Sequence, residues 1–234
     1  MTKVLKKQNM GTSDLGWLQS RFHFSFAEYR NPQNINFGVL RVLNDDIVKS
    51  NSGFNTHPHQ NMEIITYIVD GELTHKDSMG NEETLKRGEV QYLSAGDGIS
   101  HSEHNLNRQK DLRLLQIWIL PPQNGLPRLY GSHKFTREDR KDKLLNIVSS
   151  KDANTNAKIK IYQDINIFVC ETKKNQTFKI SKNRQIYFVL IEGKVTLNNE
   201  TLKFGDACEI TSEELIKIDC LEESHYLFIE MEEK

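Results

Sequence analysis

The chain has 234 residues, with 31 basic and 32 acidic side chains and a formal net charge of −1. This length exceeds what one small barrel needs and suits two domains. The charges are mixed along the chain without a basic block, which argues against direct binding of nucleic acid or anionic lipid.

Targeting and redox signals are weak. No run approaches the roughly 18 apolar residues that a bilayer span needs, and no apolar segment follows the basic residues at the N-terminus. The cysteines, Cys170, Cys208 and Cys220, are odd in number and have no metal-binding spacing, so we expect free thiols in a reducing compartment. The sequence therefore predicts a cytoplasmic protein without a membrane partner.

Short apolar runs rich in Val, Ile, Tyr and Phe follow one another along the whole chain. They end at Gly, Asn or Asp, and no long stretch keeps a 3.6-residue period, so the sequence predicts an all-β fold with few short helices. In chain order, the clearest predicted strands are Gly38 to Leu43, Glu63 to Val69, Val90 to Leu93, Leu112 to Leu120, Ile165 to Cys170, Ile186 to Ile191 and Tyr226 to Met231.

An internal repeat divides these strands into two sets. The strand and turn around Gly71 resemble those around Gly193, and residues 83–89 match residues 200–206 in five of seven positions with an acidic residue at each end. Because the two matched turns occur in the same order, the same supersecondary unit is used twice. Between Pro121 and Asp142 prolines and charged residues interrupt the pattern, so we expect domains over residues 1–130 and 131–234.

Two pairs of potential metal ligands lie in the first copy. His57 and His59 are two residues apart, and so are His101 and Glu103. Side chains at i and i+2 on a strand point to the same face, so each pair sends two donor groups into one space. We expect hairpins turning at Asp70-Gly71 and at Gly80-Asn81 to bring the second pair against the first inside a barrel. Pro58 cannot donate to a strand ladder, so this strand should lie at a rim or a bulge.

Three imidazoles and one carboxylate make a mixed ligand set that suits one divalent transition metal. We expect Fe(II) first, while Mn, Ni, Cu, Zn or Co would also fit such a set. The competing interpretation, of polar surface or core histidines, explains four spaced ligands less well.

The motifs around these residues resemble those of cupins, and among cupins they are similar to the pirin family. The resemblance lies in residues 53–63 with Gly71, in Gly88 with residues 94–105, and upstream in residues 24–29 and 40–46. It implies a bicupin, two tandem antiparallel barrels of the jelly-roll type. In most cupins the fourth ligand corresponds to Glu63, and in pirins to Glu103, so the resemblance assigns the metal to His57, His59, His101 and Glu103. Glu63 then faces the barrel near the metal or is an ordinary strand glutamate.

Counting from the turns of the second copy places Lys179, Ser181, Ile218 and Cys220 at the ligand positions, so we expect the C-terminal domain to lack metal ligands. Among other residues, His75 is expected to be structural or near the pocket mouth. Trp17, Phe22, Phe24 and Phe26 are expected to line either a pocket or the core.

Two functions remain open from the sequence. Resemblance to bacterial pirins implies a quercetin 2,3-dioxygenase-like oxidoreductase acting on a small aromatic flavonol and O2, with Glu103 or Glu63 as the catalytic base. Resemblance to eukaryotic pirin implies instead a non-enzymatic metal-containing regulator that binds a protein partner. A fold shared by many functions cannot decide between them, and we favour the enzyme.

Overall fold

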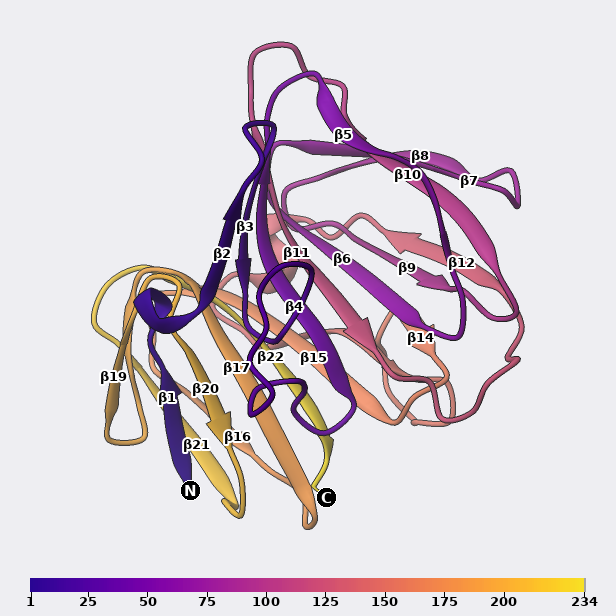
Figure 1. Ribbon diagram of the computed structural model, residues 1–234. Coiled ribbons are helices and arrows are strands. Elements are labelled where there is room, and N and C mark those ends of the chain that lie inside the picture. Colours follow the sequence, from indigo (N-terminus) through magenta and orange to yellow (C-terminus); the bar gives the residue numbers. More distant parts are fainter. Residues whose placement is uncertain (234) are drawn as a thin grey trace. The chain divides into compact units, whose positions relative to one another are not determined.

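The computed structural model describes residues 1–233 and divides them into two units of antiparallel sheet (Figure 1). The N-terminal unit comprises residues 11–135 and 161–163, and the C-terminal unit comprises residues 1–10, 136–160 and 164–233. The predicted all-β bicupin fold is confirmed. The sequence predicts a domain boundary at 130/131, whereas the two units change at 135/136, with residues 1–10 in the C-terminal unit and residues 161–163 in the N-terminal unit.

The N-terminal unit contains eleven strands in two sheets. Its strands are β2 (Gly11–Asp14), β3 (Leu18–Phe22), β4 (Leu40–Val48), β5 (Ser52–His59), β6 (Glu63–Asp70), β7 (Glu72–Asp77), β8 (Glu82–Lys86), β9 (Val90–Ser94), β10 (Ile99–Asn105), β11 (Leu112–Ile119) and β12 (Leu129–His133). The larger sheet has the order β12-β9-β6-β11-β4-β3-β2, and the smaller one has the order β5-β10-β7-β8. In Figure 1 the smaller sheet lies as a layer over β6 and β9.

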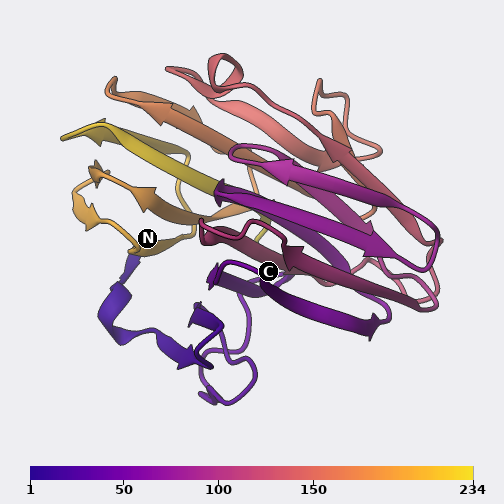
Figure 2. The same cartoon turned by 90° about the horizontal axis from the view of Figure 1, so that it is seen from above.

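The C-terminal unit is built in the same way, with one short helix. Its elements are β1 (Thr2–Leu5), the 3-10 turn η1 (Lys7–Asn9), α1 (Arg137–Arg140), β13 (Leu145–Ser150), β14 (Ile159–Ile161), β15 (Ile165–Thr172), β16 (Gln176–Lys179), β17 (Arg184–Glu192), β18 (Lys194–Leu197), β19 (Glu200–Lys203), β20 (Ala207–Ile210), β21 (Leu215–Cys220) and β22 (Ser224–Glu232). The sheets have the orders β1-β20-β17-β22-β15-β13-β14 and β16-β21-β18-β19. Strand β1 pairs with β20, and Figures 1 and 2 show the indigo N-terminus beside orange strands of this unit.

The strand orders explain the internal repeat. Strands β9, β6, β11 and β4 follow one another in the first unit as β20, β17, β22 and β15 do in the second, and β5-β10-β7-β8 corresponds to β16-β21-β18-β19. Gly71 and Gly193 occupy equivalent turns with φ values of 81° and 92°, a region that favours glycine. The predicted duplication of one supersecondary unit is therefore visible as two copies of one sheet topology.

The turn at Gly71 is a corner between sheets, which corrects the expected hairpin. Strand β6 belongs to the larger sheet and β7 to the smaller one, and the two strands are not paired. A Cβ atom at Gly71 would lie 2.6 Å from the carbonyl oxygen of Asp111, so the chain can turn here only without a side chain. The second expected hairpin, β7 to β8 around Gly80, is present.

The apolar residues of the strands fill the interior of each unit, where β6 and β17 are buried almost throughout. Within residues 1–233, no helix has the length and apolar character that a bilayer crossing requires. All three cysteines are free thiols, as expected.

Candidate metal centre

The two predicted ligand pairs lie on neighbouring strands of the smaller sheet. In the pairing of β10 with β5, His101 stands directly opposite His57. The ring centroids of His57, His59 and His101 are 4.5 to 4.9 Å apart, and one nitrogen of each ring lies within 4.8 Å of the others. Glu103 follows on the same face of β10, as its alternating burial shows. The spacing in the sequence thus corresponds to convergence in space for the three histidines, whereas Glu103 is grouped with His75 and His101.

Strand β5 is irregular where the histidines lie. It is an edge strand of its sheet, and its pairing with β10 shifts register between His101 and Glu103. Pro58 pairs with Ser100 on this edge, where a missing N–H donor leaves no neighbour unsatisfied. The expectation of a rim at Pro58 is met by the edge position of β5, whereas the register shift lies between His101 and Glu103.

His57 and His101 each have one ring nitrogen that is available to bind a metal. His101 is 2% exposed and its Nε2 atom has no hydrogen-bond partner among the described residues, although buried polar atoms are normally paired. The Nδ1 atom of His57 lies 2.7 Å from the carbonyl oxygen of Asn55, to which it can donate only as Nδ1–H. That tautomer leaves Nε2 of His57 with a free lone pair. The residues present therefore fit a divalent ion.

Burial favours the neutral form of the His59 and His101 imidazoles. It lowers the pKa of His101 to about 2, helped by repulsion from His57, His59 and His75, and it lowers the pKa of His59 to about 4, helped by His57. Because a metal binds the unprotonated ring, these shifts favour coordination at neutral pH. Burial also raises the pKa of Glu103, although His75 and hydrogen bonds from Thr66 and Gln116 oppose it.

A set of buried polar side chains holds the Glu103 carboxylate. Gln91 Nε2 lies 2.5 Å from Oε1, Gln116 Nε2 lies 2.8 Å from Oε2, and Thr66 Oγ1 lies 3.2 Å from Oε1. Each of these residues interrupts an otherwise apolar strand, and this was the signal in the sequence that could have revealed them. Such partners fix the orientation of a ligand and tune its charge.

His75 contributes more to the centre than its sequence position suggested. It is fully buried on β7, and one of its nitrogens lies within 4.8 Å of ligand atoms of His101 and Glu103. Its signal in the sequence was its separation by two residues from Asp77, the same spacing as the ligand pairs. His75, His101 and Glu103 form a second buried cluster that shares two residues with the predicted set.

Glu63 lies elsewhere in the same unit. Its buried carboxylate accepts hydrogen bonds from the Tyr92 hydroxyl at 2.5 Å and from the backbone N–H groups of Tyr162 and Gln163, each at 2.8 Å. It belongs to neither of the clusters of metal-binding side chains in residues 1–233. Its oxygens are occupied in holding together segments that are about a hundred residues apart in sequence.

We expect Glu63→Gln to lower the free energy of unfolding by about 2 kcal/mol and to leave metal affinity unchanged. The new amide nitrogen must face one of three donors, and a buried hydrogen bond to a charged group is worth about 1.5–3 kcal/mol. Urea denaturation and metal titration would measure the two effects, with exposed Glu82→Gln on β8 as the control. Weakened metal binding at unchanged stability would return Glu63 to the metal centre.

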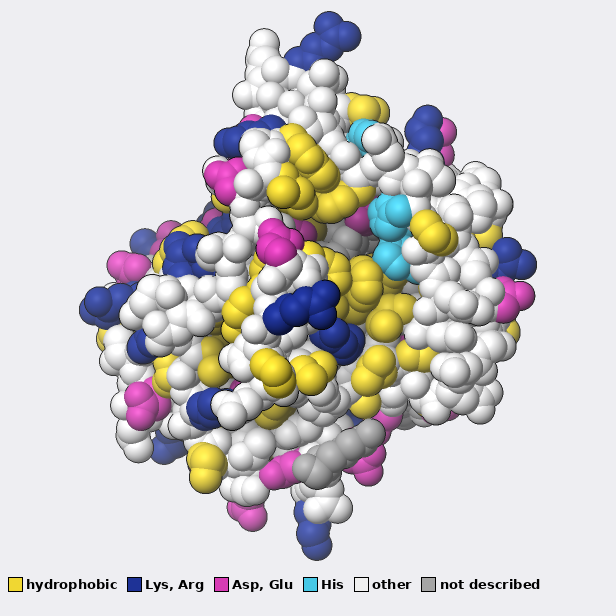
Figure 3. Space-filling view, viewed as in Figure 1, with side chains coloured by type: hydrophobic (Ala, Val, Ile, Leu, Met, Phe, Trp, Pro, Cys, Tyr) yellow, Lys and Arg dark blue, Asp and Glu magenta, His cyan; other side chains and the backbone are white. Residues whose placement is uncertain are grey.

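A cavity of about 360 Å³ has His57, His59 and Glu103 in its wall. The other lining side chains are largely apolar and include Trp17, Phe22, Phe26, Phe54 and Trp118. Figure 3 shows histidine side chains reaching the surface beside hydrophobic ones. Of the four aromatic residues left open between pocket and core, Trp17, Phe22 and Phe26 line the cavity, while Phe24 is a core residue. The volume lies in the range of small-molecule sites.

The equivalent interior of the C-terminal unit is filled with apolar side chains. The two units can be aligned on their corner glycines, Gly71 and Gly193, which Leu73 and Val195 each follow by two residues. In this alignment the pairing of Glu103 with His75 corresponds to the pairing of Ile218 with Leu197. By the same register, Ile216 corresponds to His101, and Phe178 opposite it corresponds to His57.

This register corrects the ligand positions obtained by counting along the sequence. Ile218 corresponds to Glu103 instead of His101, and Cys220 does not occupy a ligand position, because the segment after Gly205 is two residues shorter than the segment after Gly88. Lys179 and Ser181 do not occupy ligand positions either, because the segment before Gly193 is one residue longer than the segment before Gly71. Ile216, Ile218 and Phe178 all belong to or pack against one apolar cluster.

Comparison with protein families gives two matches along the chain. Residues 3–119 match the family model described as Pirin, and residues 147–231 match that of the quercetinase C-terminal cupin domain.

Known proteins are similar over the full length. Quercetin 2,3-dioxygenase of Escherichia coli (strain K12) is 36% identical over 233 residues, which cover 99% of each chain. A pirin-like protein of Caulobacter vibrioides is 39% identical and covers 94% of this chain and 95% of its own. The crystal structure of the bacterial pirin YhhW from E. coli in complex with nickel(II) superposes with a TM-score of 0.93 at 34% identity and covers both chains completely.

Proposed function

The chain belongs to the pirin family of cupin proteins, and from this premise we propose that it is a metal-dependent dioxygenase that opens a flavonol such as quercetin with O2 and releases carbon monoxide. The observation that carries the proposal is the cavity in which aromatic walls meet His57, His59 and Glu103. A larger groove of about 960 Å³ in the C-terminal unit is lined by many charged side chains, among them Lys179 and Glu213, and suits a flat apolar substrate less well.

We assign the metal to His57, His59, His101 and Glu103, with Fe(II) as the preferred ion. Three imidazoles and one carboxylate leave open positions on an ion that takes five or six ligands. When bound, a divalent ion would act as a Lewis acid toward the 3-hydroxyl and the adjacent carbonyl of a flavonol.

The side chains of the cavity have separate tasks in this proposal. Glu103 is the base that takes the proton of the 3-hydroxyl. Gln91 and Gln116 hold that carboxylate in place. Phe26, Phe54 and Trp118 offer apolar surface to the flavonol rings and exclude water. Glu63, the other carboxylate considered, is fully engaged with Tyr92 and the backbone, and we assign it to the fold.

Oxygen uptake with two related ligands would test the proposal. Protein loaded with Fe(II) under anaerobic conditions should consume O2 and release carbon monoxide on addition of quercetin. The flavone that lacks only the 3-hydroxyl should give neither, because it offers no proton to Glu103 and no hydroxyl to the metal. Stoichiometric metal without O2 uptake across several flavonols would reject the enzyme and favour the regulatory protein with a protein partner.

A further inference from the structure

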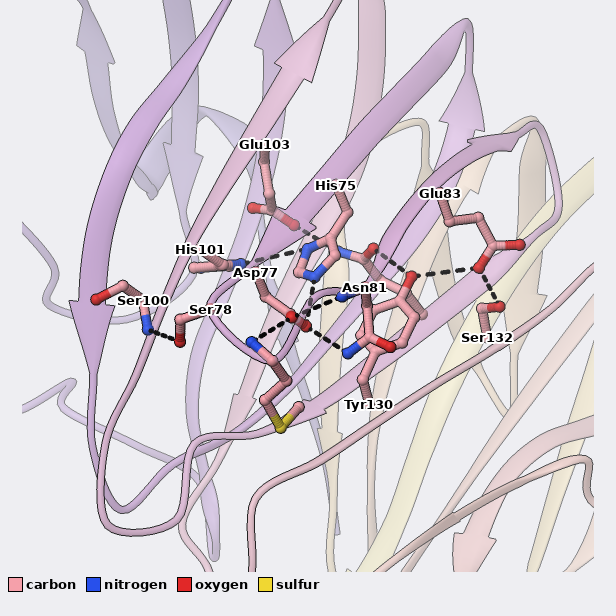
Figure 4. A network of polar contacts seen from close by, with 12 residues as sticks. His75, Asp77, Ser78, Asn81, Glu83, Ser100, His101, Glu103, Tyr130 and Ser132 are labelled. Carbon is pink, nitrogen blue, oxygen red and sulfur yellow. Dashed lines mark hydrogen bonds and ion pairs between the residues drawn. The ribbon is translucent and has the colours of Figure 1, made fainter.

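A row of three side chains lies behind the metal centre, and Figure 4 shows it from close by. His75 stands between Asp77 and His101. Its Nε2 atom is 3.2 Å from Oδ2 of Asp77, and its Nδ1 atom is 3.5 Å from Nδ1 of His101. The ring of Tyr130 stacks on the His75 ring with centroids 4.6 Å apart and planes 14° apart. His75 is thus fixed at both nitrogens and on one face.

Asp77 is held rigidly as a hydrogen-bond acceptor. Its Oδ1 accepts from the backbone N–H groups of Met79 at 2.9 Å and Asn81 at 3.1 Å, and its Oδ2 accepts from Nδ2 of Asn81 at 2.9 Å. Because a carboxylate surrounded by donors can only accept, the hydrogen between Asp77 and His75 lies on Nε2 of His75.

The tautomer of His75 determines the tautomer of His101. With Nε2 protonated, neutral His75 has a lone pair on Nδ1, and that lone pair faces Nδ1 of His101. A hydrogen bond between the two rings then requires the hydrogen to lie on Nδ1 of His101. His101 is left with an unprotonated Nε2, the buried atom that has no hydrogen-bond partner in the part of the chain that the structure describes.

We propose that His75 and Asp77 are positioning residues that hold His101 in the tautomer able to bind the metal. The inference rests on the proposed metal centre and adds two residues to it. It matches the arrangement at His57, where the Asn55 carbonyl selects the same tautomer from the backbone. Second partners of this kind fix the ring orientation of metal-binding histidines.

Asp77→Asn tests the proposal with almost no change of shape. The new amide oxygen should remain at the Oδ1 position, where two backbone N–H groups require an acceptor. Its NH2 group then faces Nε2 of His75 and moves the hydrogen of His75 to Nδ1, which opposes the Nδ1–H of His101. We expect Ni²⁺ affinity, measured by competition with a chromophoric chelator, to fall about 10–100-fold.

Two further variants separate this effect from a loss of folding. His75→Phe keeps a ring against Tyr130 but offers no acceptor to His101, and it should weaken Ni²⁺ binding by a similar factor. Asp111→Asn is the matched control, because Asp111 also accepts from a backbone N–H, that of Ser50, and from a side chain, Lys49, without a histidine. It should bind Ni²⁺ as the wild type does.

Imidazole ¹⁵N chemical shifts of the metal-free protein give a readout that is independent of activity. The wild type should show His101 protonated at Nδ1 and unprotonated at Nε2, and Asp77→Asn should alter that pattern. Wild-type Ni²⁺ affinity in Asp77→Asn with an unchanged His101 tautomer would overturn the inference. If the wild type bound no stoichiometric Ni²⁺, the proposed metal centre would fail, whereas the ¹⁵N shifts would still decide whether Asp77 sets the His101 tautomer.

Discussion

We expect His101→Ala to lose stoichiometric metal and, with it, all flavonol-dependent O2 uptake. His101 is the most deeply buried of the three clustered histidines, and its Nε2 atom has no hydrogen-bond partner within residues 1–233. Loss of an outer hydrogen bond to a ligand alone costs about 10–100-fold in metal affinity, so loss of the ligand itself should cost more than 100-fold. Metal analysis after anaerobic purification would measure the first effect and an oxygen electrode the second.

Thermodynamic linkage provides a second measure of the same variant. A ligand present at 100 times its dissociation constant stabilises the folded wild type by about 2.7 kcal/mol, and His101→Ala should show no such gain. His104→Ala is the matched control, since His104 lies on the same strand and points to the opposite face. Retention of metal by His101→Ala, or its loss in His104→Ala, would refute the proposed ligand set.

Asp46→Asn should stabilise the metal-free protein increasingly as the pH rises. Asp46 lines the cavity at 3% exposure, and its Oδ1 atom has no partner among the described residues. Burial raises the pKa of this carboxyl to about 7, the charges of Asp45 and Glu103 add to the rise, and a hydrogen bond from Ser20 opposes it. The folded state therefore keeps a proton that the unfolded chain releases near pH 4.

The sign follows from this difference in proton binding. Protonated Asp46 contributes to the free energy of unfolding, and this contribution is fully present below pH 4. It decreases by about 4 kcal/mol in all as the pH rises through 7. Between pH 5 and pH 8, the stability of Asp46→Asn relative to wild type should increase by about 3 kcal/mol. Urea unfolding in the presence of a chelator would measure it, with exposed Asp97→Asn as the control. A difference that does not vary with pH would show that Asp46 is ionised throughout.

The sequence was most informative where chemistry and strand geometry coincide. The two pairs His57 with His59 and His101 with Glu103 could be found because side chains two residues apart on a strand share a face. The structure places one nitrogen of each of the three histidines within 4.8 Å of the others. The duplication was visible because turns at Gly71 and Gly193 impose backbone angles that conserve a recognisable residue pattern within one chain.

Other features depend on long-range strand pairings, which local residue patterns do not reveal. The corner at Gly71 and a hairpin turn have the same local residues, and only the partner of β7 distinguishes them. Met1 to Met10 belongs to the C-terminal unit because β1 pairs with β20, some two hundred residues away. His75 and Asp77 lie beside His101 and Glu103 through the same kind of long-range register.

The edge position of β5 gives the metal a mechanical role. This strand carries His57 and His59 and has a single neighbouring strand, so one side of its backbone has no ladder partner. An ion bound by His57, His59 and His101 would link β5 to β10 next to the register shift between His101 and Glu103. Without the metal, β5 is held to its sheet by fewer interactions, and a loosened edge strand can pair with other chains and start aggregation. The supply of metal would then affect the tendency of this protein to aggregate as well as its activity.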